Sequence, residues 1–468
     1  MDTIAAIAAG GNAPCAIGVV RVSGPDCFRL CGQVFRASKP FGELEARKMV
    51  LGEVLDAQGR IIDRGLAVRF PAPHSYTGED CAEIHCHGAP VVLREVLEAL
   101  FAAGARLASA GEFTKRAFLN GQLDLTQAEA VIDLIDAESA AAARNAAAQL
   151  DGGLRRRLEP VQDALLEITS RFYAVVDYPD EDIEDVRPEE ITAALQEAES
   201  RLAALLNTCR RGRVLKRGVR TAIVGLPNAG KSSLLNVLAG YDRAIVTDVP
   251  GTTRDTVEET VLCGGVLLRL IDTAGLRETE DLVEQQGVER SRRAMESADL
   301  ILMVSDDAVE EAHCSREYRE EFRRLLREVG GCQTPWIFVA SKRDLSGRTS
   351  EAARRIDGDA RNRPAACVSL SALTGEGLEE LETAVAALFP AGDPAESGGL
   401  LTDQRQEEAA GRAREAVCRA LEALQDGLTT DAILTDAEEA LDALGELTGR
   451  TAREEIVERI FSRFCVGK

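Results

Sequence analysis

Residues 225–232 restrict the fold more than any other stretch, because they form a glycine-rich segment reading Gly-Leu-Pro-Asn-Ala-Gly-Lys-Ser. An apolar run at 221–224 precedes this segment, and a helix-like sequence at 233–240 follows it. In such a strand, loop and helix, backbone N–H groups turn toward an anion, while Lys231 and the Ser232 hydroxyl reach phosphate and Mg²⁺. The sequence therefore predicts a nucleotide site in an α/β P-loop domain.

The chain is long and acidic. A chain of 468 residues is too long to fold around one ordinary hydrophobic core, so two or three domains are expected. Its 55 Lys and Arg against 78 Asp and Glu give a net charge of −23, so any RNA contact needs a local patch or a partner. The first basic residue is Arg21, unlike a secretory signal, and no apolar run has membrane-spanning length. With 12 cysteines in no paired framework, these features predict a cytoplasmic protein with reduced thiols.

The pattern along the chain predicts a multidomain protein. Residues 15–22, 52–55 and 66–70 resemble strands and predict an α+β N-terminal domain. Apolar residues recur at helical spacing in two later blocks, which flank a region where strands alternate with helices. We therefore expect a Ras-like domain inserted into one discontinuous helical domain. The expected segments are an N-terminal domain at 1–119, helical parts at 120–215 and 389–468, and the inserted domain at 216–388.

Further motifs in the inserted domain follow the order of a guanine-nucleotide site. Residues 272–275 read Asp-Thr-Ala-Gly after an apolar run, which places a carboxylate near Mg²⁺ and a glycine N–H near the γ-phosphate. In the expected switch loop, Thr253 would offer its hydroxyl to the metal. Asp344 follows another apolar strand and would accept the guanine N1 and N2 hydrogens, which adenine cannot supply. Ser371 and Ala372 would back the base.

Two residues depart from the usual GTPase pattern. Leu276 stands where many GTPases have a glutamine that orients the attacking water, so another residue must position it. Ser341 stands where asparagine is usual, which predicts weaker binding of guanine rather than a lost preference. Asn228 is a candidate to hold a monovalent cation in place of an arginine finger. The acidic candidates for orienting water are Glu278, Glu280, Asp281, Glu284 and Glu289, most of which fit a solvated face.

Other polar clusters have simpler interpretations. Three of the four histidines lie within residues 74–87, with Cys81 and Cys86 among them. Their spacing matches no familiar tetrahedral metal site, so packing roles are favoured. The acidic run at 177–185 is interpreted as a solvated loop rather than a cation site. Cys465, taken alone, is most simply an inert thiol.

Taken together, residues 225–232, 251–255, 272–277 and 464–468 resemble the MnmE (TrmE) family of tRNA modification GTPases. The resemblance implies a folate-binding N-terminal domain, a helical domain and an inserted G domain. It also implies a homodimer that joins an FAD-dependent MnmG-type partner in a heterotetramer, with tRNA bound through that complex. The two proteins would attach an aminomethyl or carboxymethylaminomethyl group to C5 of the wobble uridine, position 34. The one-carbon unit would come from 5-formyl- or 5,10-methylene-tetrahydrofolate.

The resemblance also assigns site residues, position by position. The implied catalytic residues are Glu284, Lys231 and Cys465. The implied Mg²⁺ ligands are Ser232 and Thr253, and the implied K⁺ ligands are Asn228, Thr247, Val249 and Thr252. The implied folate contacts are Arg21, Glu83, Gln122 and Lys468. The GTP-binding residues are Asn228, Ala229, Gly230, Lys231, Ser232, Ser233, Thr247, Asp248, Val249, Pro250, Gly251, Thr252, Thr253, Asp272, Thr273, Ala274, Gly275, Ser341, Lys342, Asp344, Ser371 and Ala372.

Gln122 departs from the family pattern, because lysine is expected there. The change removes a charge that would pair with the glutamate tail of folate. Two other functions stay open. The main alternative is a regulatory ribosome-assembly GTPase, although such proteins usually carry a basic RNA-binding module and this acidic sequence offers none. A folate-binding scaffold with a regulatory G domain is the other.

Overall fold

The computed structural model describes residues 2–11, 13–177, 187–241, 259–271, 292–306, 315–346, 363–390 and 398–467. Two compact units make up the chain, and each draws on stretches that are distant in sequence. The first unit comprises Met1–Ile132, Gln149–Leu202 and Ala409–Lys468, and the second comprises Asp133–Ala148 and Ala203–Glu408. This division reflects compactness alone. The four segments expected from the sequence therefore stay a prediction.

A seven-stranded sheet in the order β3-β4-β5-β6-β2-β1-β7 forms the N-terminal part of the first unit. Its strands are β1 (Ile4–Ala9), β2 (Cys15–Ser23), β3 (Phe35–Arg36), β4 (Val50–Leu55), β5 (Ile61–Phe70), β6 (Cys81–Gly88) and β7 (Arg106–Leu107). Its helices are α1 (Cys27–Val34), the 3-10 turn η1 (Phe41–Glu43), α2 (Pro90–Ala103) and α3 (Glu112–Leu119). Strands are thus confirmed where the sequence predicted them, within β2, β4 and β5.

The sheet's two faces differ because successive side chains of a strand point in opposite directions. In β2, Val20 and Val22 are fully buried and pack with Leu30 of α1 and Val96 of α2. Arg21 lies between them in sequence and belongs to the opposite face. The alternation therefore places the charged candidate residue on the face that α1 and α2 do not cover.

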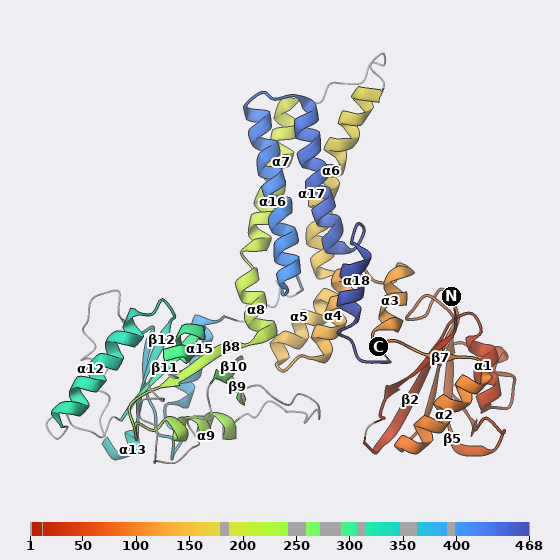
Figure 1. Cartoon of the computed structure of the whole chain (residues 1–468), viewed down its shortest axis with the longest axis horizontal. Coiled ribbons are helices and arrows are strands. Elements are labelled where there is room, and N and C mark those ends of the chain that lie inside the picture. Colours follow the sequence, from red (N-terminus) through yellow and green to blue (C-terminus); the bar gives the residue numbers. More distant parts are fainter. Residues whose placement is uncertain are drawn as a thin grey trace. The chain divides into compact units, whose positions relative to one another are not determined.

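Long helices form the rest of the first unit, some continuing into the second. They are α4 (Leu125–Ile135), α6 (Gly153–Asp177), α7 (Pro188–Leu206), α16 (Gln404–Gln425), α17 (Thr430–Thr448) and α18 (Glu454–Phe461). In α6, residues Leu154, Leu158, Val161, Leu165 and Ile168 are buried at alternating spacings of four and three, which is the seam of helices packed side by side. Figure 1 shows α6 and α17 running together although they come from opposite ends of the helical sequence. Among the described residues, no helix combines the length and apolar character needed to cross a bilayer.

The second unit contains a six-stranded sheet in the order β13-β12-β11-β8-β10-β9. All neighbouring strands pair in parallel except β9 with β10. The strands are β8 (Val219–Val224), β9 (Glu259–Cys263), β10 (Val266–Ile271), β11 (Leu300–Asp306), β12 (Trp336–Ser341) and β13 (Ala366–Ser369). The helices are α5 (Ala140–Leu150), α8 (Cys209–Arg217), α9 (Lys231–Tyr241), α12 (Arg316–Gly331), α13 (Arg343–Ser346) and α15 (Leu378–Leu388).

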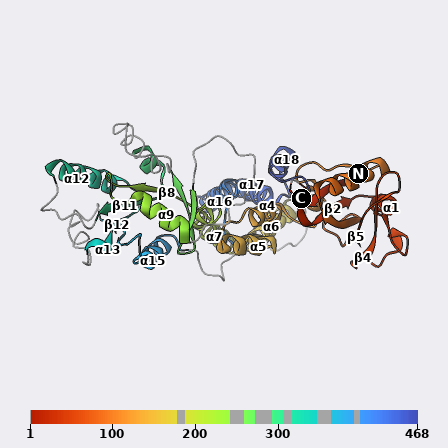
Figure 2. The ribbon, with the colours of Figure 1, turned by 90° about the horizontal axis from the view of Figure 1, so that it is seen from below.

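Both faces of this second sheet are buried, which explains its continuous apolar strands. In β11, Leu302 packs on one side with α9 and α15, while Ile301 packs on the other side with Val329 of α12. Figure 2 shows α12 on one face of the sheet and α9 and α15 on the other. This layering leaves the carboxyl ends of the parallel strands as the edge where loops can form a site.

Candidate functional site

The glycine-rich loop connects β8 to α9, as the sequence predicted. A Cβ atom on Gly225 would lie 2.3 Å from the Val304 carbonyl oxygen, so only glycine fits beside β11 there. Gly230 has φ +96° and Asn228 has φ +60°, both in the left-handed region. These turns create the tight loop in which backbone N–H groups can face a phosphate.

Lys231 lies at the start of α9 and reaches back across the loop. Its Nζ donates to the carbonyl oxygens of Gly225 and Leu226, both at 2.9 Å. Burial lowers the pKa of this ammonium group. Since both acceptors are neutral, a phosphate oxygen offers Lys231 a stronger partner than either.

The end of β12 supports the same loop. The Ser341 hydroxyl is buried and lies within hydrogen-bonding distance of the Ala229 carbonyl, and 3.2 Å from the Ser305 carbonyl. Lys342 adopts φ +62° and donates from Nζ to the Asn228 carbonyl at 3.0 Å. Ser341 and Lys342 therefore contact the phosphate loop itself. The expected weakening of guanine binding by Ser341 stays a prediction.

Asp344 lies just after β12 and faces the loop that follows β13. Its Oδ1 accepts a hydrogen bond from the Ser371 hydroxyl at 2.7 Å. Because β12 and β13 are parallel neighbours, their following loops meet at one edge of the sheet. The structure thus brings Asp344 and Ser371, with Ala372 next to it, to the edge that carries the phosphate loop.

Ser232 and Ser233 occupy the first turn of α9. Other predicted site residues lie outside the described residues. They are Thr247, Asp248, Val249, Pro250, Gly251, Thr252, Thr253, Asp272, Thr273, Ala274, Gly275, Glu284 and Lys468. Of the expected cation ligands, the described ones are Asn228 and Ser232.

A second candidate site lies on the sheet of the first unit, around a pair of charges. Arg21 on β2 and Glu83 on β6 are direct cross-strand partners, joined by Nε to Oε1 at 2.9 Å. The Arg21 guanidinium lies 5.4 Å from the ring centre of Tyr76 and 5.8 Å from that of Phe113. The other carboxylate oxygen of Glu83 lies 3.2 Å from Nε2 of His85. This arrangement combines a charged pair with flat aromatic surfaces, which suits a polar heterocycle.

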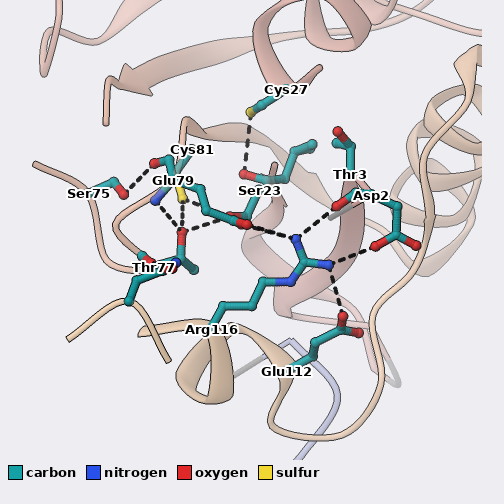
Figure 3. Close-up of polar contacts among 12 residues, drawn as sticks. Asp2, Thr3, Ser23, Cys27, Ser75, Thr77, Glu79, Cys81, Glu112 and Arg116 are labelled. Carbon is teal, nitrogen blue, oxygen red and sulfur yellow. Dashed lines mark hydrogen bonds and ion pairs between the residues drawn. The ribbon is translucent and has the colours of Figure 1, made fainter. Parts of the chain in front are cut away.

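The buried Arg116 fixes the loop that carries Tyr76 (Figure 3). Its guanidinium donates to Glu79 at 3.0 Å, to Glu112 at 3.0 Å and to the Asp2 side chain at 3.0 Å. Burial opposes the charge on Arg116, but Glu79 and Glu112 raise its pKa overall. Arg116 and Tyr76 have no local signal in the sequence, because their partners lie far away along the chain.

Glu112 also pairs with Arg106, at 2.6 Å. Although burial opposes ionisation, hydrogen bonds from Arg106, the Ser109 backbone and Arg116 lower the pKa of Glu112 to about 2. Hydrogen bonds from Arg106 likewise lower the pKa of Asp2 to about 2. The loop beside the candidate site is therefore held by ionised carboxylates at neutral pH.

The C-terminal tail lies along the first turn of α3. Val466 pairs with Ala110, and the Cys465 carbonyl accepts the Gly111 N–H at 3.4 Å. The Cys465 side chain is exposed. The tail therefore ends beside the helix that brings Phe113 to Arg21.

The predicted folate contacts are only partly brought together. Arg21 and Glu83 touch, whereas the Gln122 side chain packs against Gly78 in the loop 75–80. Two of the three clustered histidines have carboxylate partners, His87 with Asp63 at 2.8 Å and His85 with Glu83. Within the described part of the chain, no three His, Cys, Asp or Glu side chains gather as a metal site would require.

Comparison with family models covers almost the whole chain. Residues 3–122 match the model described as the GTP-binding protein TrmE N-terminus, and residues 125–465 match the MnmE helical domain. This chain belongs to the MnmE family. The region matched by the helical-domain model also contains the P-loop sheet of the second unit.

Relatives within the MnmE family are similar over their full length. A protein of Akkermansia muciniphila named tRNA modification GTPase MnmE is 43% identical, over 97% of this chain and 96% of its own length. One of the same name from Natranaerobius thermophilus is 41% identical over 100% and 99%. A solved structure, the G domain of the T. maritima FeoB iron transporter, is 27% identical over 36% of this chain and 97% of its own, with a TM-score of 0.26. That low TM-score adds nothing to the assignment.

Proposed function

We propose that this protein is a cytoplasmic, potassium-dependent GTPase that modifies C5 of the wobble uridine in certain tRNAs. It would act as a homodimer with an FAD-dependent MnmG-type partner, use a tetrahydrofolate one-carbon unit, and bind tRNA through that complex. The observation that supports this most is the full-length similarity to proteins named tRNA modification GTPase. The geometry of the two candidate sites agrees with it.

In the nucleotide site, different residues would contact the phosphates, the base and the attacking water. Lys231 would exchange the Gly225 and Leu226 carbonyls for phosphate oxygens. Asp344, held by Ser371, would accept the guanine N–H groups. Glu284 would orient the attacking water, since Leu276 cannot.

The expected cations fit the residue types present. The Asn228 side chain is exposed, and the hydrogen bond from Lys342 to this residue uses the backbone carbonyl. The side-chain amide oxygen is therefore available as a hard ligand. Asn228 with Thr247, Val249 and Thr252 would hold K⁺, and Ser232 with Thr253 would hold Mg²⁺. When bound, these ions supply positive charge to the phosphate oxygens during hydrolysis.

In the sheet site, Glu83 would accept the adjacent N–H groups of a pterin ring. Arg21 orients that carboxylate through the contact at 2.9 Å. The partly exposed ring of Tyr76 beside Arg21 offers a flat surface to the heterocycle, while the buried ring of Phe113 supports Arg21 from within. Cys465 lies in the tail segment beside the start of α3, and we propose that it is the tail residue that reaches this site.

An exposed apolar area on the same face supports the homodimer. Ile17, Leu51 and Leu66 are 63%, 70% and 37% exposed. Strand register puts all three on the face of Arg21, since Leu51 pairs with Leu66 and Leu66 with His85. A second copy covering this area would bury apolar surface and enclose the folate site.

The test compares tRNA nucleosides by mass spectrometry in cells that lack the protein and in cells re-supplied with wild type or Glu284→Ala. The proposal expects C5-aminomethyl-type uridines to disappear without the protein and to return only with wild type. Their persistence in the deletion strain, with no second modifying enzyme, would contradict it. Ribosome-assembly defects with normal nucleosides would then favour the regulatory alternative.

A further inference from the structure

The first unit contains a pocket of about 710 Å³ that the proposed reaction does not yet use. The end of α3, the start of α6 and the turn between α17 and α18 surround it, and Phe118, Leu123 and Val457 supply apolar walls. Gln122 is the one described residue of the proposed folate set that lines it. The pocket therefore begins where the folate contacts proposed from the family end.

Two polar side chains, Gln162 and Asp124, line this pocket among the described residues. Gln162 is only 5% exposed. Asp124 uses Oδ1 to accept from the Gln127 N–H at 2.9 Å, while its buried Oδ2 has no partner. Of the two, the Gln162 amide can both donate and accept a hydrogen bond, so it suits a ligand that carries peptide groups.

Three cationic side chains, Lys115, Arg155 and Arg450, also line the pocket. Among the described residues Arg450 has no carboxylate partner, and Lys115 has only a long contact of 3.9 Å with Glu458. Arg155 pairs with Glu159 on the surface, at 2.8 Å. These charges outnumber the two lining carboxylates, Asp124 and Glu454, so the rim favours an anionic ligand.

We propose that this pocket binds the oligo-γ-glutamyl tail of the folate, an inference that rests on the proposed function. Such a tail alternates peptide amides with carboxylates. Its carboxylates match Lys115 and Arg450, and its peptide groups match the Gln162 side-chain amide, which both donates and accepts.

The position of the pocket relative to Arg21 agrees with this assignment. Tyr76 contacts the Arg21 guanidinium, and two residues later Gly78 lies against the Gln122 side chain. One short loop therefore borders both the Arg21–Glu83 pair and the pocket. The cations of the pocket lie around Gln122, the position at which the family resemblance predicts a lysine.

The experiment measures the affinity of the full-length protein for 5-formyl-tetrahydrofolate carrying one or five glutamates, by calorimetry. Wild type is expected to bind the pentaglutamate about tenfold more tightly, since several exposed charge pairs contribute. The double variant Lys115→Ala/Arg450→Ala loses this preference but keeps its affinity for the monoglutamate. Arg453→Ala removes a nearby exposed arginine outside the pocket lining and keeps the preference.

Equal affinities of wild type for the two forms would overturn the inference while leaving the folate site intact. A preference that survives in the double variant would overturn it as well. If neither form binds wild type, the folate part of the proposed function fails too. Weaker tRNA binding by the double variant with an unchanged glutamate preference would assign the cations to RNA instead.

Discussion

The nucleotide site and the sheet site hold their cationic side chains in different ways. Lys231 is held by two neutral carbonyls of its own loop, whereas Arg21 and Arg116 are held by carboxylates and rings from distant segments. Neutral contacts are weak and exchange readily for phosphate, while buried charge pairs are costly to break. The difference indicates a phosphate loop whose lysine is free to move and a cofactor site that is formed in advance.

Arg116→Met tests the rigid side of this comparison and has the largest expected effect. Without the guanidinium, the largely buried carboxylates of Glu79 and Glu112 lose their counter-charge. The free energy of unfolding should fall by about 3 kcal/mol. Hydrogen exchange of the α3 backbone should accelerate by about 100-fold. The matched control is Arg29→Met, because Arg29 and its partner Asp26 are 58% and 54% exposed and such a pair contributes about 1 kcal/mol or less. Equal acceleration in both variants would contradict the account.

Lys231→Ala tests the exchangeable side. GTP turnover should fall by about 100-fold, since the variant lacks the positive charge that Lys231 would place against the transferred phosphate. The melting temperature should barely change, because only neutral carbonyl contacts disappear. Lys342→Ala serves for comparison, since its Nζ also pairs with Asp306 at 2.6 Å, and it should lower stability more and turnover less. A large loss of stability in Lys231→Ala alone would show that its contacts are structural.

Arg21→Lys separates charge from geometry in the sheet site. Lysine keeps the positive charge but loses the planar group between Tyr76 and Phe113, so folate affinity should fall about tenfold. Arg29→Ala, which removes an exposed arginine of α1, is the control and should bind folate normally. Calorimetry with 5-formyl-tetrahydrofolate measures both. Unchanged affinity in Arg21→Lys would limit Arg21 to a charge role.

The pH dependence of the contribution from Glu112 gives the test with the smallest expected effect. Its pKa of about 2 in the folded protein lies below the ordinary value of 4.5, so the ionised form stabilises the fold. That contribution is complete above pH 4.5 and disappears as the pH falls toward 2. The difference in α3 hydrogen exchange between wild type and Glu112→Gln should therefore shrink over that window. A constant difference would contradict the lowered pKa.

Local patterns in the sequence predicted the phosphate loop, strands within β2, β4 and β5, and helices on both sides of the inserted domain. Each depends on neighbouring residues, such as the glycines at 225 and 230 or the spacing from Leu154 to Ile168. Contacts across long separations were not predictable. Ser341 was interpreted only through the base, yet its hydroxyl lies beside a carbonyl 112 residues away. Arg116 meets Asp2 across 114 residues and Glu79 across 37.

Domain limits show the same dependence on distant contacts. Lys216 pairs with Asp133 at 2.8 Å and with Asp403 at 3.2 Å. These contacts draw residues 133–148 and 203–215 into the unit that contains the P-loop sheet, although their sequence pattern is helical like the segments beside them. The grouping by compactness therefore depends on contacts between distant segments, and the four-segment division stays a prediction.

Both candidate sites are proposed to serve one modification reaction. The most direct test is Arg21→Ala, re-supplied to cells that lack the protein, with tRNA nucleosides analysed by mass spectrometry and GTP turnover measured on the purified variant. We predict that the C5-aminomethyl-type uridines stay absent while GTP turnover remains close to wild type. Wild-type levels of these nucleosides, in a variant that no longer binds folate, would contradict the claim and leave the sheet site outside the chemistry.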